Sequence, residues 1–165
     1  MMRTFKVLSA LLSYPDEELI AAARDLGAVL DTEALVPAEQ RHALDSLLHE
    51  VASGEVYDLQ ERYGLLFDRS KTLALHLFEH VHGEGRDRGQ AMVDLKAMYD
   101  GAGLVIAANE LPDYLPLFLE FLSTRPIGEA RALLGEAAHI FAALAERLDR
   151  RQSSYKAVIN ALVAI

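Results

Sequence analysis

Three of the six histidines lie close together, at positions 76, 80 and 82. We expect a helix over residues 71–81, on which His76 and His80 share one face because they are four residues apart. Imidazoles with this spacing are able to bind a metal ion, and Glu79 would add an oxygen ligand. The order differs from the HExxH motif, however, and a fourth ligand would have to be distant. We therefore predict no metal site, and keep metal binding by His76, His80 and His82 as the alternative.

A glycine-rich turn, Gly83–Gly89 with the sequence GEGRDRG, follows the histidines. Backbone N–H groups of such a turn, at the start of a helix, are able to hold an anion, and Arg86 and Arg88 add positive charge. The GxxxxGK[ST] pattern of a phosphate-binding loop is missing, and Glu84 and Asp87 oppose an anion. We predict that Arg86 and Arg88 stabilise the turn by pairing with acids, and anion contact stays open as the alternative.

Other residue types give little support to catalysis. The chain has no cysteine, which excludes a disulfide, a thiolate metal site and a cysteine nucleophile. None of the serines lies in a GxSxG motif, and no pair of carboxylates is assigned by spacing. We predict that the chain is not an enzyme, has no catalytic residue and needs no cofactor.

Composition limits the class of protein further. The 165 residues are 52% hydrophobic and carry a net charge of −9, which suits one globular domain over residues 1–165 and argues against a nucleic-acid partner. No apolar stretch approaches the roughly 20 residues of a membrane span, and the N-terminal apolar run is too short for a secretory signal. We expect no stable membrane insertion and a cytoplasmic location.

Apolar residues recur along the chain at spacings of three and four, which predicts helices throughout. A first helix should end near Tyr14, because Pro15 disfavours helical geometry in the residue before it. Further helices are expected over residues 15–26, 37–53, 55–67, 71–81, 86–100, 114–123, 126–149 and 153–163. No strand pairs are expected, so the predicted fold is all-α, a single-domain bundle of about eight or nine helices.

The predicted helix at 114–123 combines apolar residues with flanking acids. Asp113 is expected to cap the N-terminus of this helix. Leu117, Phe118 and Phe121 do not all face one way on a helix, so part of this surface is a candidate groove wall rather than core. Such a groove would bind an apolar and basic peptide, and a fully buried helix is the alternative.

Two long runs of sequence resemble a known family. They are YGLLFDRSKTLALHLFEHVHGEGRDRGQAMVDL, residues 63–95, and ELPDYLPLFLEFLS, residues 110–123. With the opening SALLSYPDEEL, they resemble the assembly chaperones of membrane-bound respiratory nitrate reductase, within the TorD/DmsD group of redox-enzyme maturation proteins. Tyr114 stands where the wider group has the histidine of its E-x-x-D-H motif, so no role is carried over to this side chain. Family members usually continue with a polar C-terminal tail, which we expect this sequence to lack.

The resemblance implies an all-helical chaperone without catalytic activity. Its implied partner is the apo catalytic (alpha) subunit of respiratory nitrate reductase, bound through an N-terminal segment that resembles a twin-arginine leader. The chaperone would keep this subunit competent for insertion of the molybdenum cofactor and iron–sulfur cluster before membrane assembly. Direct contact with the molybdenum cofactor, through the Gly83–Gly89 turn or through His76, His80 and His82, is the alternative.

We predict that the peptide groove is walled by the helices at 71–81, 86–100 and 114–123. Apolar burial would supply affinity there, and acids would attract the basic leader. The predicted apolar contacts are Leu75, Phe78, Leu117 and Phe121, and the acidic ones are Glu79, Asp87, Glu110, Asp113 and Glu120. Some of these acids are expected to pair internally with Arg86 and Arg88.

Overall fold

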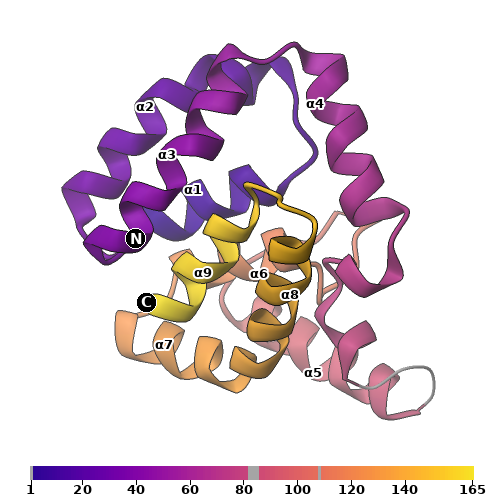
Figure 1. Cartoon of the computed structure of the whole chain (residues 1–165). Coiled ribbons are helices and arrows are strands. Elements are labelled where there is room, and N and C mark those ends of the chain that lie inside the picture. The colour runs from indigo at the N-terminus through magenta and orange to yellow at the C-terminus, as the bar shows by residue number, and fades with distance from the viewer. Residues whose placement is uncertain (1, 82–85, 108) are drawn as a thin grey trace.

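The computed structural model describes residues 2–81, 86–107 and 109–165, and within these ranges it contains helices but no strand (Figure 1). The α-helices are α1 (Arg3–Leu12), α2 (Glu17–Glu33), α3 (Ala38–Ser53), α4 (Val56–Tyr63), α5 (Arg86–Gly101), α6 (Leu115–Ser123), α7 (Ile127–Glu136), α8 (Ala138–Arg150) and α9 (Lys156–Ala164). One π-helical segment, η1 (Gly64–Asp68), and two 3-10 segments, η2 (Lys71–Leu73) and η3 (Leu77–His80), join α4 to α5. The predicted all-α fold with about eight or nine helices is confirmed.

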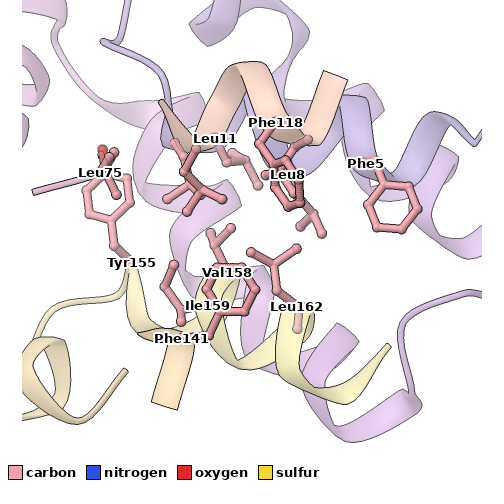
Figure 2. Packing of buried hydrophobic residues seen from close by; sticks show 14 of the residues in the cluster. Phe5, Leu8, Leu11, Leu75, Phe118, Phe141, Tyr155, Val158, Ile159 and Leu162 are labelled. Atoms are coloured by element: carbon pink, nitrogen blue, oxygen red, sulfur yellow. The ribbon is translucent and has the colours of Figure 1, made fainter. Parts of the chain in front are cut away.

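The core lies where α1, α6 and α9 meet. α1 packs against both α2 and α6, while α9 packs against α3 and α8. Figure 2 shows Leu8 of α1, Phe118 of α6 and Ile159 of α9 pointing toward one another in this core. A single cluster of buried side chains runs from α1 to α9, so the segments between α4 and α6 are held against a continuous apolar interior.

The first two helices follow local sequence signals, with one exception. α1 ends at Leu12, before Pro15, and Asp16 caps α2 by accepting a hydrogen bond from the Leu19 N–H (2.8 Å). α2 continues through Gly27, where the sequence predicted a break. A Cβ atom at Gly27 would lie 2.8 Å from Nη2 of Arg41, so this glycine makes room for α3 instead of ending the helix.

The predicted long helix at 126–149 is wrong, because the structure divides it into α7 and α8. The change of direction falls at Ala137, which is buried and has φ −101° and ψ 5°. The regular spacing of apolar residues across the junction concealed it, since both helices turn apolar side chains inward. Figure 1 shows α7 and α8 pointing in different directions, and their junction forms part of the site described next.

Candidate functional site

Residues 71–81 do not form the predicted helix. An extended stretch separates η2 from η3, and it is bonded to the start of α6: the Leu115 N–H donates to the carbonyl of residue 75 (2.8 Å), and the N–H of residue 77 donates to the Asp113 carbonyl (3.0 Å). The apolar side chains of this stretch and of its two flanks are all buried, namely Leu73, Ala74, Leu75 and Leu77. These backbone hydrogen bonds to Asp113 and Leu115 hold the stretch extended, although its apolar spacing favours a helix.

Asp113 does not cap α6 as predicted. Its side chain is fully buried, and Oδ2 accepts a hydrogen bond from the backbone N–H of Phe78 (3.0 Å). Its Oδ1 has no hydrogen-bond partner among the described residues. Burial raises the pKa of Asp113 above 3.8, although the Phe78 N–H, His76 and Arg88 all act to lower this pKa. The carboxyl group thus ties η3 to the chain that leads into α6.

An apolar pocket of about 340 Å³ opens beside η3. The side chains that line it come from η3, α5, α6 and the α7–α8 junction: Leu77, Phe78, Val81, Ala91, Leu95, Met98, Phe118, Leu133, Ala137 and Ile140. Val81 is 48% exposed and Met98 is 39% exposed, so solvent reaches these walls. Exposed aliphatic groups around a concave apolar surface are typical of a binding site, and we call this feature the apolar pocket.

Three polar residues lie among these apolar walls, namely Asp94, Glu136 and His139. All three are exposed. Asp94 accepts a hydrogen bond from the Gln90 side chain (2.8 Å), and neither Asp94 nor Glu136 forms an ion pair within the described part of the chain. Two carboxylates without a cationic partner would attract a positively charged group on a ligand.

The four apolar residues predicted for the groove lie in different environments. Phe78 lines the apolar pocket, whereas Leu75 and Phe121 are 3% and 2% exposed and belong to the core. Phe121 packs against Tyr99 with ring centroids 4.9 Å apart. Leu117 is half-buried and packs on the core. Of these residues, Phe78 therefore lies in direct contact with the pocket.

The charged residues of the prediction are also dispersed. Glu79 lies 3.6 Å from Arg88, which is an internal ion pair of the kind expected for this arginine. Arg86 and Asp87 are exposed in the first turn of α5, and Glu110 is half-buried. The predicted turn Gly83–Gly89 includes residues 83–85, which lie outside the described residues.

Glu120 lies on a different side of α6 from Phe118. Phe118 lines the apolar pocket, whereas Glu120 lines a separate hollow with Lys6 of α1 and with Tyr14 and Glu18 at the turn into α2. The sequence placed these residues in one groove because they are close along one helix. The structure shows that α6 separates two surfaces.

The histidines do not form the predicted helical pair. His76 packs on Tyr114, with ring centroids 5.2 Å apart, and His80 Nε2 lies 2.7 Å from the carbonyl oxygen of Ala74. His82 lies outside the described residues. Within the residues that the structure does describe, no three or more histidine, aspartate or glutamate side chains are arranged to hold a metal ion.

Part of the apolar pocket was not anticipated from the sequence. Met98, Leu133, Ala137 and Ile140 line it, but none of them was predicted as a site residue. The last three come from the α7–α8 junction, which the regular apolar spacing concealed. No local sequence pattern distinguished Met98, which is 39% exposed in the structure, from the buried residues of α5.

Comparison with known proteins defines the class. The sequence model of the family described as "Nitrate reductase delta subunit" matches residues 33–159. The fold resembles the crystal structure of a candidate redox enzyme maturation protein from Archaeoglobus fulgidus, with a TM-score of 0.67, 23% identity and coverage of 99% of this chain and 92% of the other. The chain therefore belongs to the nitrate reductase delta subunit family and has the helical fold of that maturation protein.

Individual relatives agree with this assignment. The chain is 42% identical over 159 residues to NarJ of Escherichia coli K12, a nitrate reductase molybdenum cofactor assembly chaperone, covering 96% of this chain and 67% of the relative. It is 35% identical over 164 residues to a probable chaperone of the same name from Bacillus subtilis, covering 98% and 86%. Because these relatives are named as chaperones and not as catalysts, the prediction that the chain is not an enzyme is confirmed. None of the described helices is long and apolar enough to cross a membrane.

Proposed function

We propose that this protein is a cytoplasmic assembly chaperone for respiratory nitrate reductase, and that its apolar pocket binds the N-terminal leader-like segment of the apo catalytic subunit. Bound in this way, the subunit would stay competent for insertion of the molybdenum cofactor and iron–sulfur cluster before it attaches to the membrane. The observation that carries the proposal is the apolar pocket, because it combines a concave apolar surface with two carboxylates that form no ion pair with any described residue.

The apolar walls would supply most of the affinity. Phe78, Met98 and Phe118 come from three separate segments, so a ligand between them would bury its side chains on several sides. A volume of about 340 Å³ suits a few apolar side chains of a short segment rather than a whole folded domain. An amphipathic helix or turn with two or three apolar anchors has this form.

The carboxylates would set the orientation of the segment. A leader-like segment places basic residues beside apolar ones, and Asp94 and Glu136 carry negative charge beside the apolar walls. Exposed charges of this kind change association rate and register more than they change affinity. Of the acids predicted from sequence, Glu79 follows the pocket wall residue Phe78 directly, but its charge is offset by the ion pair with Arg88.

Calorimetric titration with a peptide of the catalytic subunit's first ~15 residues tests the proposal, at a length suited to a helix in a groove. Met98→Glu should weaken binding by about 30-fold or more, since it places a charge on the apolar wall. Val93→Glu is the matched control. Val93 lies on the same helix and is 61% exposed, but it does not line the apolar pocket.

Both variants add the same charge to α5, so a general electrostatic effect would change both affinities equally. Equal affinities of Met98→Glu and Val93→Glu would remove the apolar pocket as the binding site. No binding of the unaltered chain at micromolar peptide in moderate salt would reject the leader-binding proposal itself. Asp94→Asn with Glu136→Gln should weaken binding by only roughly threefold, as is typical of exposed charges.

A further inference from the structure

A second surface gathers exposed aromatic and aliphatic side chains on the side of α4 and η1. Tyr14, Tyr57 and Leu65 are 53%, 75% and 45% exposed, and all three line one hollow together with Glu61 and Asp68. We call this feature the Tyr14 surface. Tyrosine is enriched where proteins bind other proteins, because its ring offers a large contact area and its hydroxyl tolerates water.

Contacts with neighbouring residues fix the position of the Tyr14 surface. Tyr14 packs edge-on against the ring of Tyr63 (centroids 5.7 Å apart, 89°), and the Tyr63 hydroxyl donates a hydrogen bond to the Leu12 carbonyl (2.7 Å). The Gln60 side chain donates to the Pro15 carbonyl (2.8 Å), which ties α4 to the turn after α1. Binding to such a surface costs little ordering of the chain.

Leu65 lies on the π-helical segment η1 and faces outward. Leu66 and Phe67 are buried at 8% and 5% exposed, while Leu65 remains 45% exposed on the widened turn. Single π-helical turns interrupt otherwise regular helices and are frequent at functional sites. The segment therefore adds an apolar group to the hollow without removing core contacts.

The charge around the Tyr14 surface is mainly negative. Its hollow meets a second hollow through Tyr14, and together the two are lined by five carboxylates and two cationic side chains. Glu61, Asp68 and Glu120 form no ion pair with any described residue. These carboxylates are thus available to a ligand.

We infer that the Tyr14 surface binds a second, basic and extended segment of polypeptide, separate from the one in the apolar pocket. Cationic side chains would pack on the Tyr14 and Tyr57 rings and pair with Glu61 and Asp68. A second copy of this chain would bring the same negative surface and a net charge of −9, which disfavours self-association. Nucleic acid and anionic membranes are repelled for the same reason.

The absence of tryptophan from the sequence allows a local test. Tyr57→Trp places a single fluorophore on the Tyr14 surface, and Met98→Trp places one at the apolar pocket. The probe is a peptide of alternating leucine and arginine about ten residues long, with a leucine–glutamate peptide as its matched control. The leucine–arginine peptide should change Tyr57→Trp emission saturably at micromolar concentration, and higher salt should weaken the effect.

Variants in the Tyr57→Trp background identify the contacts. Tyr14→Ala should weaken binding of the leucine–arginine peptide about tenfold, and Glu61→Gln with Asp68→Asn by roughly threefold to tenfold. Val105→Ala, at a 91% exposed residue outside both hollows, should leave binding unchanged. Calorimetry should also be done on the unaltered chain and on Tyr14→Ala, both with Tyr57 retained. The ratio of their peptide affinities should equal the ratio measured in the Tyr57→Trp background, which controls for any effect of the tryptophan.

Several results would overturn the inference. They are a response to the leucine–arginine peptide at Met98→Trp alone, an equal response to the leucine–glutamate peptide, or no effect of Glu61→Gln with Asp68→Asn. Emission of Tyr57→Trp that depends on protein concentration without peptide would assign the surface to a second copy. These outcomes are independent of leader binding, because that is measured with a different peptide at a different position.

Discussion

The apolar pocket and the Tyr14 surface differ in the elements that line them and in almost every physical property. The first is concave and is lined mainly by aliphatic and aromatic carbon from four segments. The second exposes two tyrosines and is lined by carboxylates that form no ion pair with any described residue. Phe118 and Glu120, two residues apart on α6, belong to the first and to the hollow beside the second.

This difference predicts that the two proposed sites would contribute differently to binding. A concave apolar site gains affinity by removing side chains from water, and that gain changes little with salt. A site lined by exposed charges gains mainly in association rate and selectivity, and salt weakens it. A chain with both sites would bind one segment with high affinity and a second segment with lower affinity and a faster association rate.

Truncation of one aromatic residue in each region should give the largest contrast. Phe118 is 6% exposed, so Phe118→Ala should lower the free energy of unfolding by about 3–5 kcal/mol. Tyr14 is half exposed, so Tyr14→Ala should lower it by only about 1 kcal/mol, the contribution of one ring contact. Urea unfolding measures both, and equal losses would show that the Tyr14 surface is as much part of the core as the pocket.

Removal of the Asp113 side chain should give the next largest effect. Asp113→Ala takes away the acceptor of the Phe78 N–H and should cost about 1–3 kcal/mol of unfolding free energy. It should also weaken leader binding, because η3 is a wall of the apolar pocket. Peptide binding at the Tyr14 surface should stay unchanged. Asp113→Asn keeps an acceptor oxygen and should retain the leader affinity that Asp113→Ala loses.

The raised pKa of Asp113 gives a prediction with a definite sign. Between pH 3.8 and the raised value, the folded chain keeps a proton that the unfolded chain has lost. The contribution of Asp113 to the free energy of unfolding therefore falls as pH rises through this interval, by at most about 1.4 kcal/mol per pH unit. Asp113→Asn should lack this fall, and chemical unfolding of both chains between pH 4 and 7 measures the difference.

The pKa of Glu33 is shifted in the opposite direction, so the pH profile of the unaltered chain contains both effects. The contribution of Asp113 is therefore obtained by comparing the unaltered chain with Asp113→Asn. Burial acts to raise its pKa, but hydrogen bonds from Thr4 and from the Arg3 N–H outweigh burial and lower the pKa below 4.5. Its stabilising contribution is present above the unfolded pKa and is lost as pH falls through the folded one. Identical pH profiles of the Asp113→Asn chain and the unaltered chain would contradict the buried position of Asp113.

The sequence predicted those helices whose ends are determined by nearby residues. Pro15 and Asp16 separate α1 from α2, and Pro37 precedes α3, so these helices lie close to their predicted positions. Gly27 was misinterpreted as a break because its partner, Arg41, is distant in sequence. Local signals determine helix ends, whereas contacts between helices determine which glycines are needed for packing.

The site was less accessible to sequence reasoning for the same reason. The extended stretch at 74–76 is stabilised by backbone bonds to the residues before α6, and Asp113 serves η3 rather than its own helix. The α7–α8 junction contributes pocket walls that no local pattern marked. The runs at 63–95 and 110–123, which carry the family resemblance, include both η3 and α6, and residues of these two segments line the apolar pocket.

Salt dependence should give the smallest effect and still distinguish the two regions. Raising the ionic strength from about 0.05 M to about 0.3 M should weaken peptide binding at the Tyr14 surface severalfold, because its carboxylates are exposed. Leader binding in the apolar pocket should change less over the same range. Calorimetry with each peptide measures how its affinity changes with ionic strength. A stronger dependence for the leader peptide would indicate that charge contributes more than apolar contact to binding in the apolar pocket.

The most direct test of leader binding titrates the leader peptide into the two single-tryptophan chains, Met98→Trp and Tyr57→Trp. Burial of the tryptophan in the apolar pocket should shift the Met98→Trp emission to shorter wavelength in a saturable way. The Tyr57→Trp emission should stay constant at the same peptide concentrations. A saturable shift in Tyr57→Trp with none in Met98→Trp would contradict the assignment of the leader segment to the apolar pocket.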